Sequence, residues 1–396
     1  MEYRIMNFKE RVLTALAHEE PDRVPVMGLI MDPSTVSQIT GKSATNIVNY
    51  LDKPVIGGVV KGLVNRNWFW NRMYYGNFAL AMESAIELGF DANWAIYALM
   101  KLYDDSSSTL GTAMHDAYGR VWEMGTNDRG DLAVDYSRAL CPTEEEWEAW
   151  VDAKAPLFDQ LIDNATAFHK KLAREYGDRI LPIGYAAPGI FENSWQAIGF
   201  VNFTKLVYEN PEFIRRVVDF QTDHYLRHLE GVMESGVEIV LGGDDLGQKT
   251  GPLMRPALIN ELYGESYRRV AELVHSRGRK FIFHSCGKIY KFLDMFIDWG
   301  FDGIITMEPT ADMELARVRE QVGHRLALIG NLDVSHLLVK GTQKEVIEAV
   351  KDAIKAAGPG GGYILSAAHS HPYVDATRLR WMVEAAHEYG RYPLRG

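Results

Sequence analysis

The stretch KFIFHSCG (residues 280–287) predicts a buried β-strand that ends in two potential metal ligands and a turn glycine. Side chains on a strand alternate between its two faces, so His284 and Cys286 point the same way and can share one ion. Zinc binds both imidazole nitrogen and thiolate sulfur, and its catalytic sites use three protein ligands with one open position. A single histidine at a strand end is more often a hydrogen-bonded rim residue, so a metal site needs support from elsewhere in the chain.

Other apolar runs of strand length alternate with helical patterns along the chain. Together with 280–284, they are residues 23–28, 90–99, 180–185, 239–242, 303–307, 326–330 and 363–366. Continuous apolar strands that alternate with helices predict a parallel sheet covered on both faces, and eight of them suit closure into a (β/α)8 TIM barrel, an α/β fold. We expect residues 1–396 to form a single barrel domain, with a helix at 7–20 as an N-terminal extension.

An inserted segment at about residues 30–89 is largely helical and rich in aromatic side chains between Trp68 and Phe78. Two interpretations are open. The aromatic residues form either a small additional core or an apolar lid over a flat ligand, since such residues dominate ligand pockets. Further along, residues 118–123 predict part of a hairpin.

The composition argues against several classes of partner. The chain has 396 residues and a net charge of -11, without a run of lysine or arginine, so nucleic acid and anionic membranes are poor partners. There are only two cysteines, and the N-terminus lacks the apolar core of a signal peptide. No stretch has the apolar length needed to cross a bilayer. We expect a cytoplasmic protein, and homo-oligomers are compatible with this composition.

Polar residues follow the strand ends throughout the second half of the chain. They are Asp244 and Asp245, His284 and Cys286, Glu308, Asn331 and Asp333, and His369 and His371. A TIM barrel gathers the carboxyl ends of its strands at one mouth, where its catalytic residues lie. These side chains are therefore expected to share one site.

The third metal ligand has two candidates, His369 and His371. We favour His369 because it is nearer to the end of the last strand. A zinc ion with one cysteine and two histidines carries a net charge of +1, which suits an anionic leaving group.

The carboxylates and their neighbours are assigned other roles. Asp244 and Asp245 are adjacent, so only one is expected to enter the pocket. The pair has three open roles: orienting a ligand histidine, binding polar groups of a substrate, or capping a helix. We predict Glu308 and Asp245 as catalytic groups, with a displaceable fourth metal ligand and a rim hydrogen bond as alternatives for Glu308. Asp244, Tyr185 and Asn331 are predicted to bind substrate.

Two other patterns predict no ligand site. His224 and His228 lie four residues apart on a helix, but no HExxH pattern accompanies them, so we expect a solvated helix face. The glycine-rich run at 358–362 precedes a strand and does not open a helix, which predicts a turn and not a phosphate cradle.

Several segments together resemble the uroporphyrinogen decarboxylase superfamily over nearly the whole chain. They are RVLTAL at 11–16, PDRVP at 21–25, GGDDLG at 242–247, HSCG at 284–287, GNLD at 330–333 and ILS at 364–366. The decarboxylase branch carries an Arg-Gln-Ala-Gly-Arg segment after the first strand, whose arginines grip substrate carboxylates. This chain has GLIMDP at 28–33, without an arginine, so a polycarboxylate would be poorly held.

The sequence is more similar to the zinc-dependent, corrinoid-linked methyltransferases of this superfamily. That branch uses a His-x-Cys pair and a later cysteine as zinc ligands. His284 and Cys286 match the pair, and His369 stands at the later position, a departure that favours demethylation of a methyl donor over methylation of a thiol. The resemblance implies zinc and the transfer of a methyl group from a small donor to a corrinoid (cobalamin) carried by a partner protein. A lid formed by the aromatic segment from Trp68 to Tyr75 would favour an aryl methyl ether as the donor.

Two alternatives to this function remain. One is a metal-free decarboxylase of the uroporphyrinogen decarboxylase type, in which Asp245 and His369 act directly. The other is a non-catalytic protein that only carries or docks onto a corrinoid partner.

Overall fold

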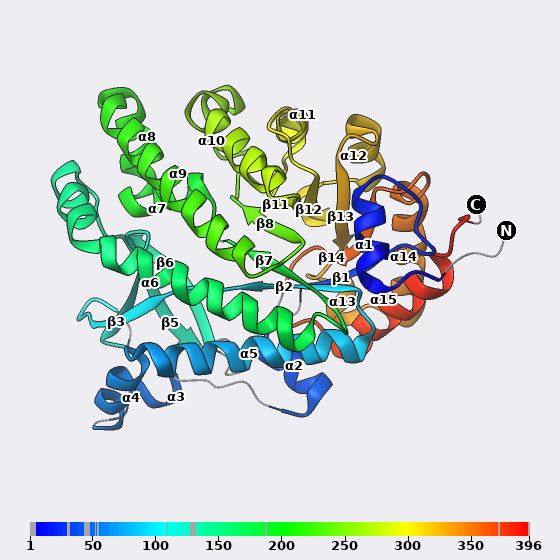
Figure 1. The fold of residues 1–396 in the computed structure, drawn as a ribbon, viewed down its shortest axis with the longest axis horizontal. Helices are drawn as coiled ribbons and strands as arrows, with labels where there is room; N and C mark the ends of the chain where they lie inside the picture. Colours follow the sequence, from blue (N-terminus) through cyan, green and yellow to red (C-terminus); the bar gives the residue numbers. More distant parts are fainter. Residues whose placement is uncertain are drawn as a thin grey trace.

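The computed structural model describes residues 5–29, 32–42, 48–51, 53, 55–108, 110–126, 132–186, 188–370 and 373–394. Eight parallel strands close into a barrel (Figure 1). In order around it they are β1 (Val26–Gly28), β14 (Tyr363–Ala367), β13 (Ala327–Leu332), β12 (Gly303–Thr306), β11 (Lys280–Ser285), β8 (Ile239–Gly243), β7 (Leu181–Tyr185) and β2 (Ala92–Ile96). Each overlaps one of the eight predicted strands, so the predicted (β/α)8 barrel is confirmed.

Helices surround the barrel and connect its strands. The helices that lie along the outside of the barrel, between successive strands or after the last one, are α5 (Asn67–Leu88), α6 (Glu144–Tyr176), α9 (Pro211–Glu234), α10 (Pro256–Ser276), α11 (Leu293–Asp298), α12 (Leu315–Val322), α14 (Gln343–Ala357) and α15 (Ala376–Tyr389). Shorter helices are α1 (Phe8–Leu16), α2 (Pro33–Thr40), α3 (Val48–Leu51), α4 (Ile56–Val64), α7 (Ile190–Ile198), α8 (Phe200–Glu209) and α13 (Leu337–Lys340). Within the described ranges, no helix is both long enough and apolar enough to cross a membrane.

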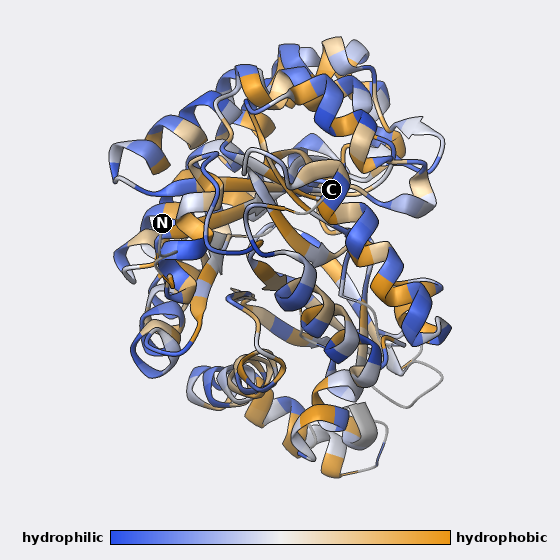
Figure 2. Cartoon of the chain, turned by 90° about the vertical axis from the view of Figure 1, so that its right-hand side faces the viewer, coloured by the Kyte–Doolittle hydropathy of each residue, from blue (hydrophilic) through white to orange (hydrophobic). Residues whose placement is uncertain are grey.

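The alternation of side chains on β11 shows how the barrel is filled. Ile282 packs in the inner core of the barrel, whereas Phe281 and Phe283 pack outward against the helices. Both environments are apolar, which is why this strand is a continuous apolar run and why the barrel strands in Figure 2 are mostly orange. His284 and Cys286 continue the series that begins with Ile282, so they point toward the inside of the barrel mouth.

The loop after β2 carries a four-stranded antiparallel sheet that the sequence predicts only in part. Its strands are β3 (Met100–Asp104), β4 (Thr112–Asp116), β5 (Arg120–Thr126) and β6 (Leu132–Ala139), joined in the order β3-β4-β5-β6. The predicted hairpin at 118–123 covers the turn before β5 and the start of that strand. Strands β3 and β6 are partly exposed and have no continuous apolar run, so their pattern is weak.

The inserted aromatic residues pack beside the barrel. Tyr74 and Phe78 of α5 contact Phe168 of α6, and Tyr74 also contacts Tyr97, which follows β2. The Trp70 indole N–H donates to the carbonyl of Ala98 at 2.9 Å. This packing corresponds to the small additional core, and the lid interpretation finds no support in these contacts.

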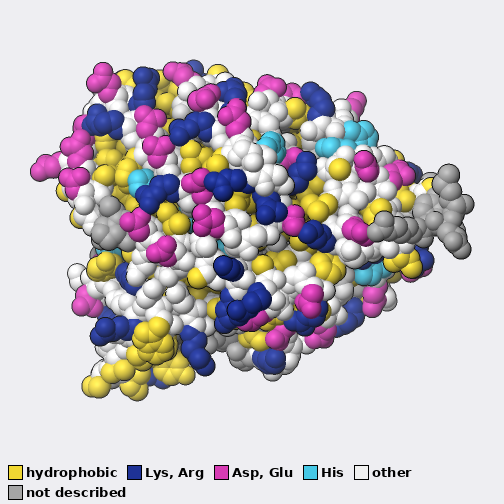
Figure 3. Space-filling view, viewed as in Figure 1, with side chains coloured by type: hydrophobic (Ala, Val, Ile, Leu, Met, Phe, Trp, Pro, Cys, Tyr) yellow, Lys and Arg dark blue, Asp and Glu magenta, His cyan; other side chains and the backbone are white. Residues whose placement is uncertain are grey.

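Part of the insertion presents apolar side chains at the surface. Val55 and Val59, next to and within α4, are 85% and 58% exposed. Figure 3 shows a yellow, hydrophobic patch at the lower left, where Figure 1 has α4, and charged side chains of both signs scattered over the rest of the visible face.

Candidate metal centre

Two histidines and one cysteine meet at the carboxyl ends of the barrel strands. His284 Nε2, at the end of β11, lies 3.3 Å from Cys286 Sγ. His369, in the loop after β14, brings its Nδ1 to 3.9 Å from the same sulfur atom. Cys286 and His369 are 83 residues apart in the chain, so closure of the barrel brings them together. The structure thus places both predicted histidine ligands beside the predicted cysteine ligand.

The cluster contains two overlapping sets of potential ligand atoms, and both sets include Cys286. Asp245 joins His284 and Cys286 in one set, and Glu308 joins His369 and Cys286 in the other. Within each set the atoms all lie within 4.8 Å of one another. The predicted set of three spans both. The side chains of His284 and His369 are 24% and 29% exposed, so a small ligand can reach them from the mouth.

Glu308 orients one of the histidines. One carboxylate oxygen is hydrogen-bonded to His369 Nε2, and the other accepts the Gly287 N–H at 2.9 Å. The contact with Nε2 turns His369 Nδ1 toward Cys286, the arrangement in which a carboxylate positions a ligand histidine. This contact fits a positioning role for Glu308, and its grouping with Cys286 and His369 also fits the alternative of a fourth metal ligand. The acid/base role of Glu308 stays a prediction.

The backbone that delivers Glu308 is strained. Thr306 and Met307 both have positive φ angles, 95° and 49°, which cost non-glycine residues roughly 1–2 kcal/mol each. The Thr306 hydroxyl donates to the Ser285 carbonyl at 2.8 Å and thereby ties the end of β12 to the ligand strand. Strain of this kind is common at functional sites and cannot be read from the sequence.

Asp245 faces the other half of the cluster. Its Oδ1 accepts the Cys286 N–H at 2.9 Å and lies 3.5 Å from His284 Nε2. Burial by itself would raise the pKa of Asp245, but the hydrogen bonds and charge of His284 and Cys286 N–H lower it to about 2. Asp245 is thus an anion next to two predicted ligands, as its position in the sequence suggested.

Asp244 has a different environment, which corrects the prediction that it contacts substrate. It is completely buried, and its carboxylate accepts the N–H groups of Phe191 and Glu192 and the Tyr267 hydroxyl. The two amides belong to the first turn of α7, whose N-cap residue, Gly189, has no side chain to satisfy them. Helix capping, one of the three roles considered, is the role that this geometry supports.

Gly189 is needed for this contact. A Cβ atom at Gly189 would lie 2.1 Å from Asp244 Oδ2, so only glycine allows the carboxylate to approach the helix end.

Tyr185 and Asn331, the other predicted substrate-binding residues, lie in different surroundings. A Cβ atom built on Gly243 would be 2.8 Å from both the Tyr185 hydroxyl and His284 Cβ, so this hydroxyl is next to the ligand strand. The Asn331 amide donates to the carbonyls of Met307 and Met313 at 3.0 and 3.2 Å. Tyr185 is thus placed at the site, whereas Asn331 holds the loop after β12, and contact of either with substrate stays a prediction.

The environment of the Cys286 thiol suits a cation. Burial, together with the negative charges of Asp245 and Glu308, raises the pKa of this thiol well above its usual value. Two carboxylates and two imidazoles surround the thiol, and together these groups form a donor set for a divalent ion. Such an ion would favour deprotonation of the thiol to the thiolate. The described residues fit zinc, with His284, Cys286 and His369 as its ligands. His371 lies outside the described residues.

Comparison with known proteins identifies the family. The uroporphyrinogen decarboxylase family model matches residues 144–389, more than half of the chain. The chain belongs to the uroporphyrinogen decarboxylase family. It is 28% identical over 202 residues to uroporphyrinogen decarboxylase from Actinobacillus pleuropneumoniae serotype 5b (strain L20), a match that covers 48% of this chain and 53% of that protein.

Other relatives agree with this assignment. Uroporphyrinogen decarboxylase from Myxococcus xanthus (strain DK1622) is 25% identical over 228 residues, covering 56% of this chain and 62% of its own length. The chain thus spans about half the length of the curated relatives it matches. A solved methyltransferase from Methanosarcina mazei shares the fold with a TM-score of 0.69 and 20% identity, covering 97% of this chain and 99% of its own.

The sequence interpretation of this family member missed two features near the site. Glu192, in the first turn of α7, accepts the Asp245 N–H at 3.3 Å. Burial, together with the charges of Asp245 and Asp244, raises the pKa of Glu192 well above its usual value. Trp94 of β2 lies edge-on to Tyr185 with 5.1 Å between ring centroids. Neither residue belongs to a motif, and an acidic residue in a first helical turn usually complements the helix dipole.

The predicted solvated face of α9 is also wrong. His228 is 1% exposed, and its Nδ1 is 3.0 Å from the Tyr118 hydroxyl. His224 stacks near Phe158 and Phe220. Helix α6 and the turn between β4 and β5, which carries Tyr118, cover this side of α9, and the sequence does not indicate that covering.

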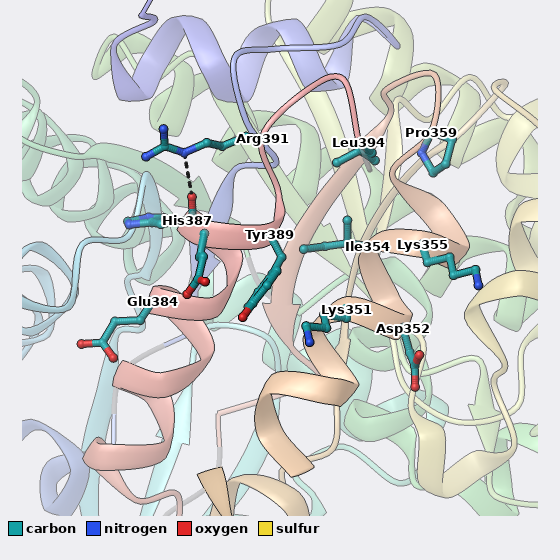
Figure 4. A pocket seen from close by; sticks show the side chains of 11 residues that line it. Lys351, Asp352, Ile354, Lys355, Pro359, Glu384, His387, Tyr389, Arg391 and Leu394 are labelled. Atoms are coloured by element: carbon teal, nitrogen blue, oxygen red, sulfur yellow. Dashed lines mark hydrogen bonds between the residues drawn. The ribbon is translucent and has the colours of Figure 1, made fainter. Parts of the chain in front are cut away.

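A groove lies away from the metal centre. It has a volume of about 970 Å³ and lies between the C-terminal halves of α14 and α15 (Figure 4). Helices in a barrel run opposite to the strands, so these helix ends lie toward the amino ends of the strands. Its lining carries three cationic and three anionic side chains, namely Lys351, Lys355, Arg391, Asp352, Glu384 and Glu388. This balance does not favour one sign of charged ligand.

Proposed function

We propose that this protein is a zinc-dependent methyltransferase that moves a methyl group from a small donor at the barrel mouth to the cobalt of a corrinoid carried by a partner protein. The observation that carries the proposal is that His284 Nε2 and His369 Nδ1 both lie close to the Cys286 sulfur atom, at 3.3 and 3.9 Å. Zinc held by these groups would act as a Lewis acid toward the heteroatom that loses the methyl group.

The surrounding residues have defined tasks in this proposal. Glu308 keeps His369 Nδ1 directed at the ligand cluster, and Asp245 fixes the Cys286 backbone through its N–H. Tyr185 and Trp94 supply aromatic surface next to the ligand strand, which favours an aryl methyl ether as donor. The aromatic residues of α5 were predicted to have this role, but they pack elsewhere.

A second candidate is a metal-free decarboxylase, as the names of the curated relatives suggest. In that reaction Asp245 and His369 would act directly on the substrate. The segment after β1 lacks arginine, so a polycarboxylate would lose charge-assisted bonds at that position. This absence is the reason to prefer the methyltransferase.

The test combines metal content with methyl transfer. Purified protein, resupplied with zinc, is analysed for bound metal and mixed with cob(I)alamin and methyl donors: phenyl methyl ethers, methylamines, methyl thioethers and methanol. We expect one zinc per chain and the methylcobalamin spectrum with at least one donor. Cys286→Ala and His369→Ala should abolish both, because each removes one of three ligands.

Matched controls separate ligand loss from general damage. Cys141→Ala removes the other cysteine, which is buried and far from the cluster in sequence, and His336→Ala removes an exposed histidine. Both variants should retain zinc and turnover. Wild-type protein without stoichiometric zinc, or a Cys286→Ala variant with unchanged zinc and turnover, would overturn the proposal. Decarboxylation of uroporphyrinogen by zinc-free protein would establish the second candidate.

A further inference from the structure

A continuous chain of hydrogen bonds, buried at the antiparallel sheet and partly buried toward the barrel mouth, links the sheet to the metal centre. Arg120 of β5 is anchored by Asp116, its Nε lying 2.6 Å from the Asp116 carboxylate. Its Nη1 donates to Gln196 Oε1 at 2.9 Å. The Gln196 amide in turn donates to Glu192 Oε1 at 3.1 Å, and Glu192 Oε2 accepts the Asp245 N–H at 3.3 Å. Asp245 then contacts the backbone of Cys286 and the ring of His284.

The first members of this chain are shielded from water. Arg120 is 3% exposed and Gln196 is 6% exposed. The helix that carries Gln196 and Glu192, α7, packs against β5 and β6 on one side, and Asp244 caps its first turn on the other. A buried polar group that loses its hydrogen-bond partner lowers the free energy of unfolding by about 1–3 kcal/mol. Each hydrogen bond in the chain therefore constrains the position of the next residue.

We propose that Arg120, Gln196 and Glu192 form a relay of positioning residues that holds Asp245, and through it His284 and Cys286, in the arrangement that binds a divalent metal ion. The proposal rests on the proposed function, because it assumes that the cluster binds a metal. It gives the antiparallel sheet a role in holding the metal ligands. The barrel closes without this sheet, so closure does not explain its presence. Outer partners of metal ligands typically change metal affinity 10–100-fold when they are mutated.

The pattern of donors and acceptors makes the relay testable. Arg120 at one end and the Asp245 N–H at the other end are both donors. Gln196 can accept a hydrogen bond on one side and donate one on the other, since its amide has one acceptor and one donor group. The chain is satisfied only if one of its two middle residues accepts on both sides, and the ionised carboxylate of Glu192 does so.

Exchange of the two middle residues preserves this pattern. In the double variant E192Q/Q196E, the new carboxylate at position 196 accepts from Arg120 and from the amide NH2 group at position 192. The amide oxygen at position 192 then accepts the Asp245 N–H. In the single variant Glu192→Gln, two donors must face each other whichever way the amides turn. The two variants differ little in size, so they separate hydrogen bonding from packing.

The experiment measures metal binding directly. Metal-free protein is titrated with zinc in competition with a chromophoric chelator, and with cobalt(II), whose thiolate charge-transfer and ligand-field bands report the coordination of Cys286. We expect Glu192→Gln to weaken zinc binding by roughly 10–100-fold and to change the cobalt spectrum. The exchanged double variant should recover most of the affinity and the wild-type spectrum.

The control is Tyr136→Phe. It removes the hydrogen bond of the Tyr136 hydroxyl to the Gln196 backbone carbonyl, at 2.8 Å, and leaves the side-chain relay in place, so wild-type zinc affinity is expected. The relay is overturned if Glu192→Gln binds zinc as tightly as wild type with the same cobalt spectrum, or if the exchanged variant stays as weak as the single variant. Wild-type protein that binds neither metal would instead overturn the proposed function, and the relay with it.

Discussion

At the scale of single residues, glycines decide how closely the metal-centre loops approach each other. Gly287 has a φ of 81°, and a Cβ atom there would lie 2.4 Å from the carbonyl carbon of Gly247. Its N–H donates to Glu308, so the same residue allows the close approach and holds the carboxylate that orients His369. The sequence indicated a turn at Gly287 but did not indicate that the loop with Gly247 packs against it.

Gly287→Ala should therefore damage both stability and metal binding. Left-handed backbone alone costs a residue with a Cβ atom roughly 1–2 kcal/mol, and the contact with Gly247 adds to it. The matched control is Gly278→Ala, at a φ of 65° with nothing within 4 Å of the new atom. Thermal denaturation and zinc content should show a larger loss for Gly287→Ala. Equal losses in the two variants would contradict the role of the close approach.

At the scale of elements, the packing of α9 against α6 and against the turn between β4 and β5 makes the fold sensitive to acid. His228 of α9 is buried against Tyr118, and burial lowers its pKa to about 3. The unfolded chain binds a proton there near pH 6.5, whereas the folded protein does not, so the free energy of unfolding falls as the pH decreases from about 6.5 toward 3.

For His228 alone the loss should reach about 2 kcal/mol at pH 5 relative to pH 7. Urea denaturation at both pH values measures it. His228→Gln retains a hydrogen-bonding group for Tyr118 but cannot be protonated, so the difference between the two pH values should shrink. His336→Gln, at an exposed position, should leave that difference unchanged. An unaltered pH dependence in His228→Gln would exclude the proposed effect.

At the scale of the whole molecule, an ion-pair cluster joins the N-terminal helix to the first two barrel strands. Asp91, which precedes β2, lies 2.6 Å from Arg11 of α1 and 2.8 Å from Arg23, and it also accepts the Val26 N–H of β1. Asp22 binds Arg11 as well. Two motifs of the family resemblance, RVLTAL and PDRVP, thus supply a structural cluster remote from the metal centre in sequence.

Asp91→Ala should destabilise the fold by about 3–5 kcal/mol, because it removes the carboxylate partner of the largely buried Arg23, one of the two carboxylates that bind Arg11, and the acceptor of the Val26 N–H. The comparison is Asp312→Ala, which breaks an exposed pair with Lys288 at 3.1 Å and should cost at most about 1 kcal/mol. Chemical denaturation of both variants tests the difference. Similar, small losses would show that the cluster does not hold the N-terminal helix to the barrel.

The sequence by itself determined the barrel and the place of the site. Continuous apolar strands such as 280–284 must be buried on both faces, and the polar residues that end them, including His284, Glu308 and His369, must then gather at one mouth. What these residues touch was decided only in the tertiary structure. Asp244 became a helix cap, and Glu192 became the partner of Asp245, because hydrogen bonds between segments far apart in the chain depend on distances and directions that local sequence patterns do not contain.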